Sequence, residues 1–289
     1  MKTIQADGPF LQHQLSLFSR ISEAFCGREA DAGTIERGMP PLLQFGVIPA
    51  LDREKYEATL YVVTPWVEGR TLNRLVAEAV QERRSIAISE ALALLRAVAA
   101  GLRDFSRCEA GACLVHQDIK PSNILIATDP RLHAVVIDLD TAFFLDEIPQ
   151  EIPYGSCGYT APEGISRRGV WPNEAMDVFS FGVVAHEVLT GCWPYPFQPR
   201  FGDDLRFWVS HYRRKDALCV SEGLPSDIRS LLESCVSLDP QERPSYESLV
   251  ERLDLLVDRY VEMHGLFCVF EPGIGSSRML ENLAISDTF

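Results

Sequence analysis

The run HQDIKPSNILI at residues 116–126, followed by VIDLD at residues 136–140, decides how this 289-residue chain is interpreted. Three polar side chains stand in the predicted loop before the first strand-like run: Asp118, Lys120 and Asn123. Asp138 follows the second strand-like run, so a hairpin would bring all four side chains to one edge. The edge would then hold a candidate base, a cation and two oxygen ligands. The oxygen ligands suit a hard metal that also binds phosphate oxygens. The four groups together also suit phosphoryl transfer, which depends mainly on positioning and charge neutralisation.

The run at 116–126 resembles the catalytic loop of eukaryotic-type (Hanks-type) serine/threonine protein kinases. Three later stretches support this resemblance in the expected order: GSCGYTAPE at 155–163 resembles the end of an activation segment, DVFSFG at 177–182 the start of the long buried helix of the large lobe, and ERPS at 242–245 the late arginine motif. The resemblance implies that Arg243 pairs with Glu163. A divergent bacterial member of the family is among the interpretations left open.

The resemblance implies an α+β, bilobal protein-kinase-like fold, with a small, reduced β-containing N-lobe and a large, mainly helical C-lobe. We expect a truncated N-lobe over residues 1–66, a C-lobe over 67–264 and a tail over 265–289. The strand-like run EATLYVVTPWV at 57–67 then leads to the hinge, and residues 61–68 would receive the adenine ring. Apolar spacing predicts a helix capped by Ser89 and a second helix that starts after Asp177 and stops at Gly191.

The resemblance also implies the role of each site residue. Asp118 would accept or orient the proton of the attacking hydroxyl, and Lys120 would neutralise the γ-phosphate of ATP. Asn123 and Asp138 would hold Mg²⁺ or Mn²⁺, and Asp140 is a further candidate ligand.

The small lobe departs from the family pattern. Lys2 is the available candidate for the lysine that pairs with the ATP phosphates, and it leaves no room for a preceding glycine-rich loop. The helix predicted over residues 10–25 offers Gln and His where the family has a glutamate. A partner chain, or sequence upstream, could supply the missing strands of the N-lobe.

Two departures fall in the large lobe. Gln117 replaces the usual arginine, so activation-loop phosphorylation is not expected to act as a switch, because no guanidinium is available to bind the phosphate. Leu139 and Asp140 replace the usual phenylalanine and glycine. Ser156 stands where the family often has a substrate-side threonine, although a plain loop serine fits equally well.

Three functions stay open at this stage. The favoured one is ATP- and Mg²⁺-dependent phosphoryl transfer to serine or threonine of a protein substrate. The absent glycine loop and helix glutamate motivate a pseudokinase, a binding or scaffold module without turnover. A small-molecule kinase is the third, and the Ala-Pro-Glu segment with its arginine partner disfavours it.

Composition excludes other classes. The chain carries 41 Asp and Glu against 27 Lys and Arg, a formal net charge of −14, which argues against a nucleic-acid or anionic-membrane partner. We expect no membrane span, because no apolar run approaches the roughly 20 residues that a bilayer requires. Eight scattered cysteines without a Cys-x-x-Cys pair indicate a reducing, cytoplasmic location.

Overall fold

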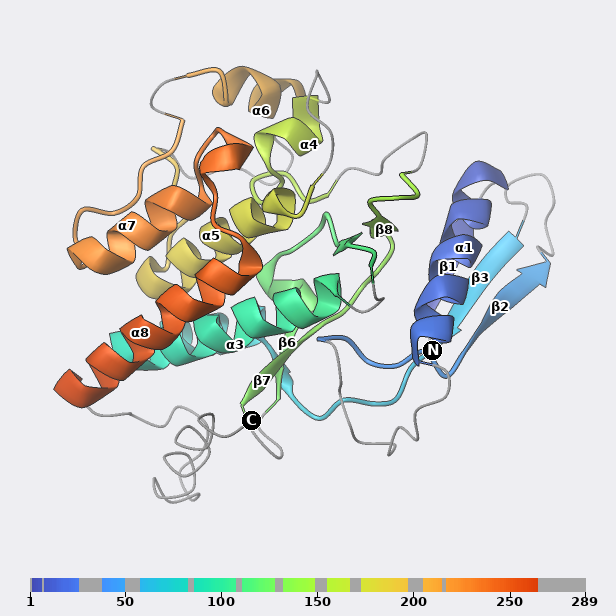
Figure 1. Ribbon diagram of the computed structural model, residues 1–289, viewed down its shortest axis with the longest axis horizontal. Helices are drawn as coiled ribbons and strands as arrows, with labels where there is room; N and C mark the ends of the chain where they lie inside the picture. The colour runs from blue at the N-terminus through green and yellow to red at the C-terminus, as the bar shows by residue number, and fades with distance from the viewer. Residues whose placement is uncertain are drawn as a thin grey trace.

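The computed structural model describes residues 2–6, 8–25, 38–49, 58–82, 86–107, 111–127, 132–148, 155–166, 173–196, 205–214 and 217–264. Within these residues the chain forms a small β-containing lobe and a large, mainly helical lobe, as Figure 1 shows. The bilobal α+β fold predicted from the sequence is confirmed, including the reduced size of the small lobe.

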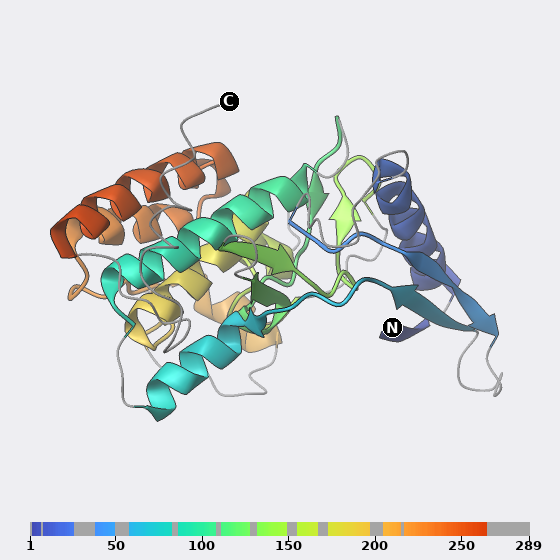
Figure 2. The same ribbon diagram turned by 90° about the horizontal axis from the view of Figure 1, so that it is seen from below.

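The small lobe is an antiparallel sheet with one helix against it (Figure 2). Its elements are β1 (Lys2–Ala6), α1 (Gly8–Phe25), β2 (Gln44–Pro49) and β3 (Ala58–Val63). The strand order is β1-β3-β2, so β3 is central and β1 lies at an edge of the described sheet. The inner face of α1 is apolar because Leu17, Phe18 and Ile21 recur at helical spacing and are all buried.

The large lobe is built around helix α5, which is buried along most of its length. Its elements in chain order are β4 (Arg70–Thr71), α2 (Leu72–Gln81), α3 (Ile88–Ser106), β5 (Leu114–Val115), β6 (Ile124–Ala127), β7 (His133–Val136), β8 (Phe143–Phe144), α4 (Pro162–Ser166), α5 (Ala175–Thr190), α6 (Leu205–His211), α7 (Ser226–Cys235) and α8 (Tyr246–His264). Helix α5 ends at Gly191, as predicted, because this glycine adopts the left-handed conformation with φ +72°. The predicted start after Asp177 is wrong: α5 begins at Ala175, and Asp177 lies in its first turn.

The predicted hairpin is present. Strands β6 and β7 pair antiparallel, with Ile124 opposite Val136, and β4 adds a third strand beside β6. The predicted cap at Ser89 is wrong: α3 already begins at Ile88, and Ser89 is buried inside its first turn. The predicted tail over residues 265–289, which contains a glycine-containing stretch at 273–277, lies outside the described residues.

The two lobes are joined by close backbone packing at Gly38. Its carbonyl oxygen accepts a hydrogen bond from the backbone N–H of Val136 at 2.7 Å. Its φ of +68° favours glycine, and a Cβ at this position would collide with the carbonyl oxygen of Gly101 in α3. Gly38 is therefore held directly against α3 of the large lobe.

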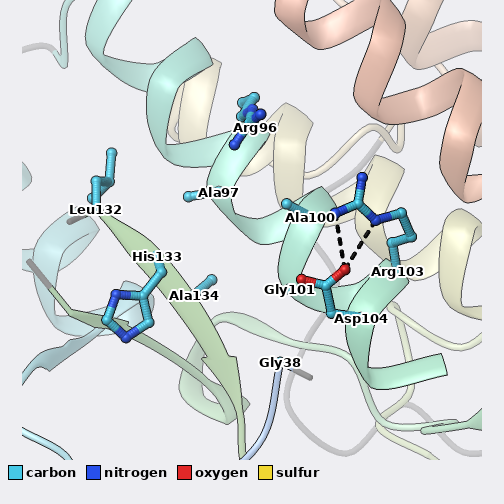
Figure 3. A pocket seen from close by; sticks show the side chains of 10 residues that line it. All are labelled: Gly38, Arg96, Ala97, Ala100, Gly101, Arg103, Asp104, Leu132, His133 and Ala134. Atoms are coloured by element: carbon cyan, nitrogen blue, oxygen red, sulfur yellow. Dashed lines mark hydrogen bonds and ion pairs between the residues drawn. The ribbon is translucent and has the colours of Figure 1, made fainter. Parts of the chain in front are cut away.

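A cavity of about 200 Å³ lies beside this joint, between α3 and β7 (Figure 3). Its two arginines already have carboxylate partners: Arg103 pairs with Asp104 at 2.9 Å and Arg96 with Asp254 at 2.7 Å. Apart from Gly38, the residues that line the cavity belong to α3 and to residues 132–134, and none comes from the run at 116–126. Among the described residues, no helix is both long enough and apolar enough to cross a membrane.

Candidate active site

The β6–β7 hairpin brings Asn123 and Asp138 to the same end of the sheet. Asn123 closes the 3-10 turn Pro121–Asn123 immediately before β6, and Asp138 follows β7 by two residues. The backbone N–H of Ile137 donates to the carbonyl oxygen of Asn123 at 3.0 Å. This hydrogen bond joins Asn123 to the residue before Asp138. The predicted metal ligands Asn123 and Asp138 therefore lie close together.

Asp118 is the centre of a hydrogen-bond network that uses both of its carboxylate oxygens. Oδ2 accepts from Lys120 Nζ at 2.7 Å and from Asn123 Nδ2 at 3.0 Å. Oδ1 accepts from the backbone N–H of Ser156 at 2.7 Å. Lys120 Nζ also donates to Ser156 Oγ at 2.8 Å. The structure therefore brings together three of the predicted site residues and ties them to the serine of the predicted activation segment.

The backbone beside Asp118 is held by a buried carboxylate that the sequence did not single out as a site residue. Asp177, at the start of α5, accepts hydrogen bonds from the backbone N–H groups of His116 at 2.7 Å and Gln117 at 2.9 Å. Burial raises the pKa of Asp177 to about 7, although these two donors oppose the rise. An aspartate inside an otherwise apolar helix was the available signal for this role.

Among the described residues, Gln117 and Asp138 are the non-glycine positions with positive φ, at +69° and +73°. Such conformations are costly for residues with a Cβ and gather at functional sites. Contacts with residues distant in the sequence hold them. Asp177 binds the Gln117 N–H, and His116 Nε2 lies 3.1 Å from the carbonyl oxygen of Ile137. Burial lowers the pKa of His116, which keeps the ring neutral in this position.

The donor set fits a Mg²⁺ or Mn²⁺ ion bound together with phosphate oxygens. Asn123 Nδ2 is used by Asp118, and the planar amide therefore directs Oδ1 away from Asp118, where it can act as a ligand. No group of three or more His, Cys, Asp or Glu side chains suited to a metal exists in the described part of the chain. Asp118, Asp138 and Asp140 thus form no ready carboxylate centre, and Mg²⁺ commonly takes only one or two protein carboxylates plus substrate phosphates.

The predicted ion pair between the activation segment and the late arginine motif is present. Arg243 donates to Glu163 through two hydrogen bonds of 2.5 and 3.0 Å, and both side chains are almost fully buried. The guanidinium also donates to the carbonyl oxygens of Ala175 and Ser237 and lies 5.0 Å from the ring centroid of Phe179. The pair connects α4 to the end of the 3-10 turn Pro240–Glu242, and Arg243 also binds the first residue of α5.

Comparison with known protein families decides the identity of this arrangement. The family described as the protein kinase domain matches residues 45–253, which is more than half of the chain. The chain belongs to the protein kinase family.

Several curated kinases are similar to this kinase domain. The serine/threonine-protein kinase PknL of Mycobacterium tuberculosis is 29% identical over 213 residues, which cover 72% of this chain and 49% of that protein. A probable serine/threonine-protein kinase, drkC, of Dictyostelium discoideum is 30% identical over 161 residues, covering 55% and 20%. Serine/threonine-protein kinase A of Synechocystis is 28% identical over 153 residues, covering 50% and 29%. The matched regions span half or less of each relative.

Gln14 stands in the part of α1 where the sequence offers Gln and His in place of the family's glutamate. It is fully buried on α1, and its Nε2 donates to the backbone carbonyl of Asp140 at 2.9 Å. Its Oε1 has no hydrogen-bond partner among the described residues. The signal in the sequence was its spacing: position 14 shares the inner face of α1 with Leu17, Phe18 and Ile21.

The small-lobe predictions are tested only in part. Lys2 is the first residue of β1 and pairs with Val62, but its side chain lies outside the described part of the structure. Tyr61–Val63 complete β3, and residues 64–68 form the irregular connection to β4. The predicted adenine-binding role of this connection stays a prediction.

Proposed function

We propose that this kinase domain transfers the γ-phosphoryl group of ATP, with Mg²⁺ or Mn²⁺, to a serine or threonine hydroxyl of a protein substrate. The observation that carries the proposal is the network in which Asp118, Lys120, Asn123 and Ser156 converge. Asp138 at the adjacent hairpin end adds the second metal ligand. Phosphoryl transfer needs this combination of an oriented base, a cation and oxygen ligands.

Asp118 would act as the catalytic base that accepts or orients the hydroxyl proton. Its two oxygens are held by donors from both sides, which fixes the plane of the carboxylate toward an incoming hydroxyl. Lys120, shared between Asp118 and Ser156, would neutralise charge on the transferred phosphoryl group.

Asn123 Oδ1 and Asp138 would hold the metal, with Asp140 as a candidate further ligand and Lys2 as the candidate phosphate-binding lysine. The bound ion would supply charge neutralisation on the ATP phosphates. The residues of the chain would supply orientation: the hydrogen bond from Ile137 N–H to the Asn123 carbonyl keeps both ligands at one edge.

A protein substrate is supported by the activation-segment end and its buried anchor. The pair between Glu163 and Arg243 holds α4 against the large lobe, directly after the stretch that contacts Asp118. The similar proteins named above are serine/threonine-protein kinases, which favours the same class of acceptor. The absence of disulfides among the described cysteines supports a reducing location such as the cytoplasm.

The test is phosphate transfer from ATP by the purified chain with Mg²⁺ or Mn²⁺, to a generic protein substrate and to itself. Asp118→Ala should reduce transfer by about a thousandfold or more while the protein stays folded, because base and orientation are both lost. Asp138→Asn should abolish metal-dependent transfer. The matched control is Asp258→Asn, which removes the same charge from the exposed face of α8. Full activity in either site variant would refute the assignment.

A pseudokinase is the second candidate, and Gln14 is the observation that favours it. A neutral amide, Gln14, occupies the buried inner face of α1, where the family has a glutamate. Nucleotide that binds to a folded chain without any transfer would support this function and reject the first.

We also propose that a partner chain can extend the small lobe at β1. In the described sheet, β1 pairs with β3 on one side only, so its other edge can accept a further strand. Transfer that appears only when such a partner is added would support this completion.

A further inference from the structure

Helix α1 of the small lobe contacts the segment that directly follows Asp138. His13 Nε2 lies 3.1 Å from the carbonyl oxygen of Ala142, and Gln14 Nε2 donates to that of Asp140. One turn further, Ser16 Oγ donates to Glu147 Oε1 at 2.6 Å. Side chains from two successive turns of α1 therefore bind residues 140–147.

Arg20 makes the densest set of these contacts. Its guanidinium donates to both oxygens of Asp146, at 2.9 and 3.1 Å, and to Glu147 Oε2 at 3.3 Å. It also lies over the Phe144 ring, 3.9 Å from the centroid. We call Ser16, Arg20, Phe144, Asp146 and Glu147 the α1 clamp.

The geometry of the clamp is one in which a surface ion pair contributes to stability. Isolated exposed pairs contribute little, whereas bidentate pairs within a network contribute more. Arg20 is only 21% exposed and lies on an aromatic face, which orders the guanidinium. The hydrogen bonds from Arg20 lower the pKa of Asp146, so the pair stays ionised over the neutral range.

The other side of the same segment is fixed to the large lobe. Strand β8 pairs with β5, with Phe144 opposite Leu114, and the backbone N–H of Leu145 donates to the carbonyl of Cys113 at 2.9 Å. Thr141 Oγ1 donates to the carbonyl of His116 at 2.8 Å, next to the catalytic loop. Figures 1 and 2 both show β8 between α1 and the large lobe. The segment thus connects α1 to the loop that carries Asp118.

Nothing in this connection requires a phosphorylated residue. Gln117 is buried, and neither amide atom of its side chain has a hydrogen-bond partner among the described residues. The charges that hold α1 are permanent ones, a guanidinium and two carboxylates.

We propose that Arg20 is a positioning residue. Through the α1 clamp it fixes α1 against the segment that directly follows Asp138, and with α1 it positions the nucleotide-binding side of the small lobe. The inference rests on the proposed function for its effect on catalysis. Its structural part, the fixing of α1 by unmodified charges, stands on the contacts alone.

The test compares Arg20→Gln with Arg20→Lys and with a matched control, Arg259→Gln. Arg259 donates to Asp227 at 2.9 Å on the surface of the large lobe, so the control loses the same charge and a comparable ion pair. Amide hydrogen exchange is measured over residues 8–25 and 139–148. We expect Arg20→Gln to speed exchange in both segments by about tenfold, Arg20→Lys to give an intermediate change, and Arg259→Gln to change neither.

Steady-state kinetics gives the second readout. Arg20→Gln should raise KM for ATP about tenfold and leave KM for the protein substrate unchanged, with Arg20→Lys partly restoring the wild-type value. In 1 M salt the difference between wild type and Arg20→Gln should shrink, because exposed charges are screened. Treatment of the wild type with a phosphatase should leave its exchange unchanged.

The outcomes separate the inference from the proposed function. Equal exchange over residues 8–25 in Arg20→Gln and Arg259→Gln overturns the clamp, whatever the activity. Loss of protection on phosphatase treatment overturns the role of unmodified charges. A wild type that transfers no phosphate while Arg20→Gln still speeds exchange overturns the proposed function and supports the clamp.

Discussion

The catalytic loop is held by two buried titratable side chains that bind backbone atoms. Asp177 accepts the N–H groups of His116 and Gln117, and His116 Nε2 contacts the carbonyl oxygen of Ile137. The loop that carries Asp118 and the strand end that carries Asp138 are thereby fixed to each other. Because both side chains are titratable and buried, we expect the stability of this loop to depend on pH.

His116 should make the free energy of unfolding depend on pH. Burial lowers its folded-state pKa below the usual value of 6.5, so on acidification the unfolded chain binds a proton that the folded chain does not. Stability is therefore full above about pH 6.5 and falls as pH drops below it, by at most about 1.4 kcal/mol per pH unit.

The measurement is urea unfolding of wild type and His116→Phe at pH 7.5 and 5.5. The wild type should lose more stability between these values than the variant does. The raised pKa of Asp177 acts in the opposite direction, and because Asp177 is present in both proteins it largely cancels in the difference. Equal losses in the two proteins would contradict the assignment to His116.

At the scale of elements, the short helix α4 depends on one buried ion pair. Glu163 in α4 accepts both hydrogen bonds from Arg243, whose other donors bind carbonyl groups at the start of α5 and before the 3-10 turn Pro240–Glu242. A five-residue helix has too few internal hydrogen bonds to be stable alone. Its position, and with it the activation-segment end, is therefore set by this pair.

Glu163→Gln should destabilise the protein by about 3–5 kcal/mol, because a fully buried guanidinium is left without its counter-charge. The control is Asp254→Asn, which breaks the half-exposed pair with Arg96 and should cost about 1 kcal/mol or less. Denaturant midpoints at constant m-value give both numbers. A loss in Glu163→Gln no larger than that of the control would show that the pair is not needed for stability.

The α1 clamp belongs to the same scale. It connects a helix of the small lobe with a two-residue strand of the large lobe, and β8 by itself is too short to hold such a helix. Charged contacts at the helix surface therefore supplement the apolar face that packs on the small sheet.

At the scale of the whole molecule, the two lobes meet through backbone atoms at Gly38. No side chain can be accommodated there, since a Cβ would collide with the Gly101 carbonyl in α3. The joint also orders the end of β7, because the Val136 N–H donates to Gly38. The relative position of the lobes thus depends on a glycine at position 38.

Gly38→Ala should destabilise the small lobe more than the large lobe. We expect residues 8–25, 44–49 and 58–63 to lose protection from hydrogen exchange well before the helices of the large lobe, with a lower Tm for the whole protein. Gly191→Ala is the matched control: its φ of +72° is also left-handed, but nothing lies within 4 Å of the added Cβ. It should cost only the conformational penalty of about 1–2 kcal/mol. A loss in Gly38→Ala that matches the control and falls evenly on both lobes would contradict this role.

The sequence by itself determined the large lobe and most of its chemistry. The run at residues 116–126, the hairpin that follows and the partners Glu163 and Arg243 were predictable, because each is carried by an ordered motif or by polar residues next to apolar strands. The cap at Ser89 failed for a local reason: α3 begins one residue earlier, and packing buries the serine.

Only the tertiary structure decided how the site is held together. Asp177 binds backbone N–H groups about 60 residues away, Gln14 binds the carbonyl of Asp140, and Arg20 reaches Asp146 across the lobes. The positive φ of Asp138 likewise follows from its surroundings. Contacts from a side chain to a distant backbone or carboxylate leave no periodic pattern in the sequence, because their partners are set by the packing of whole lobes.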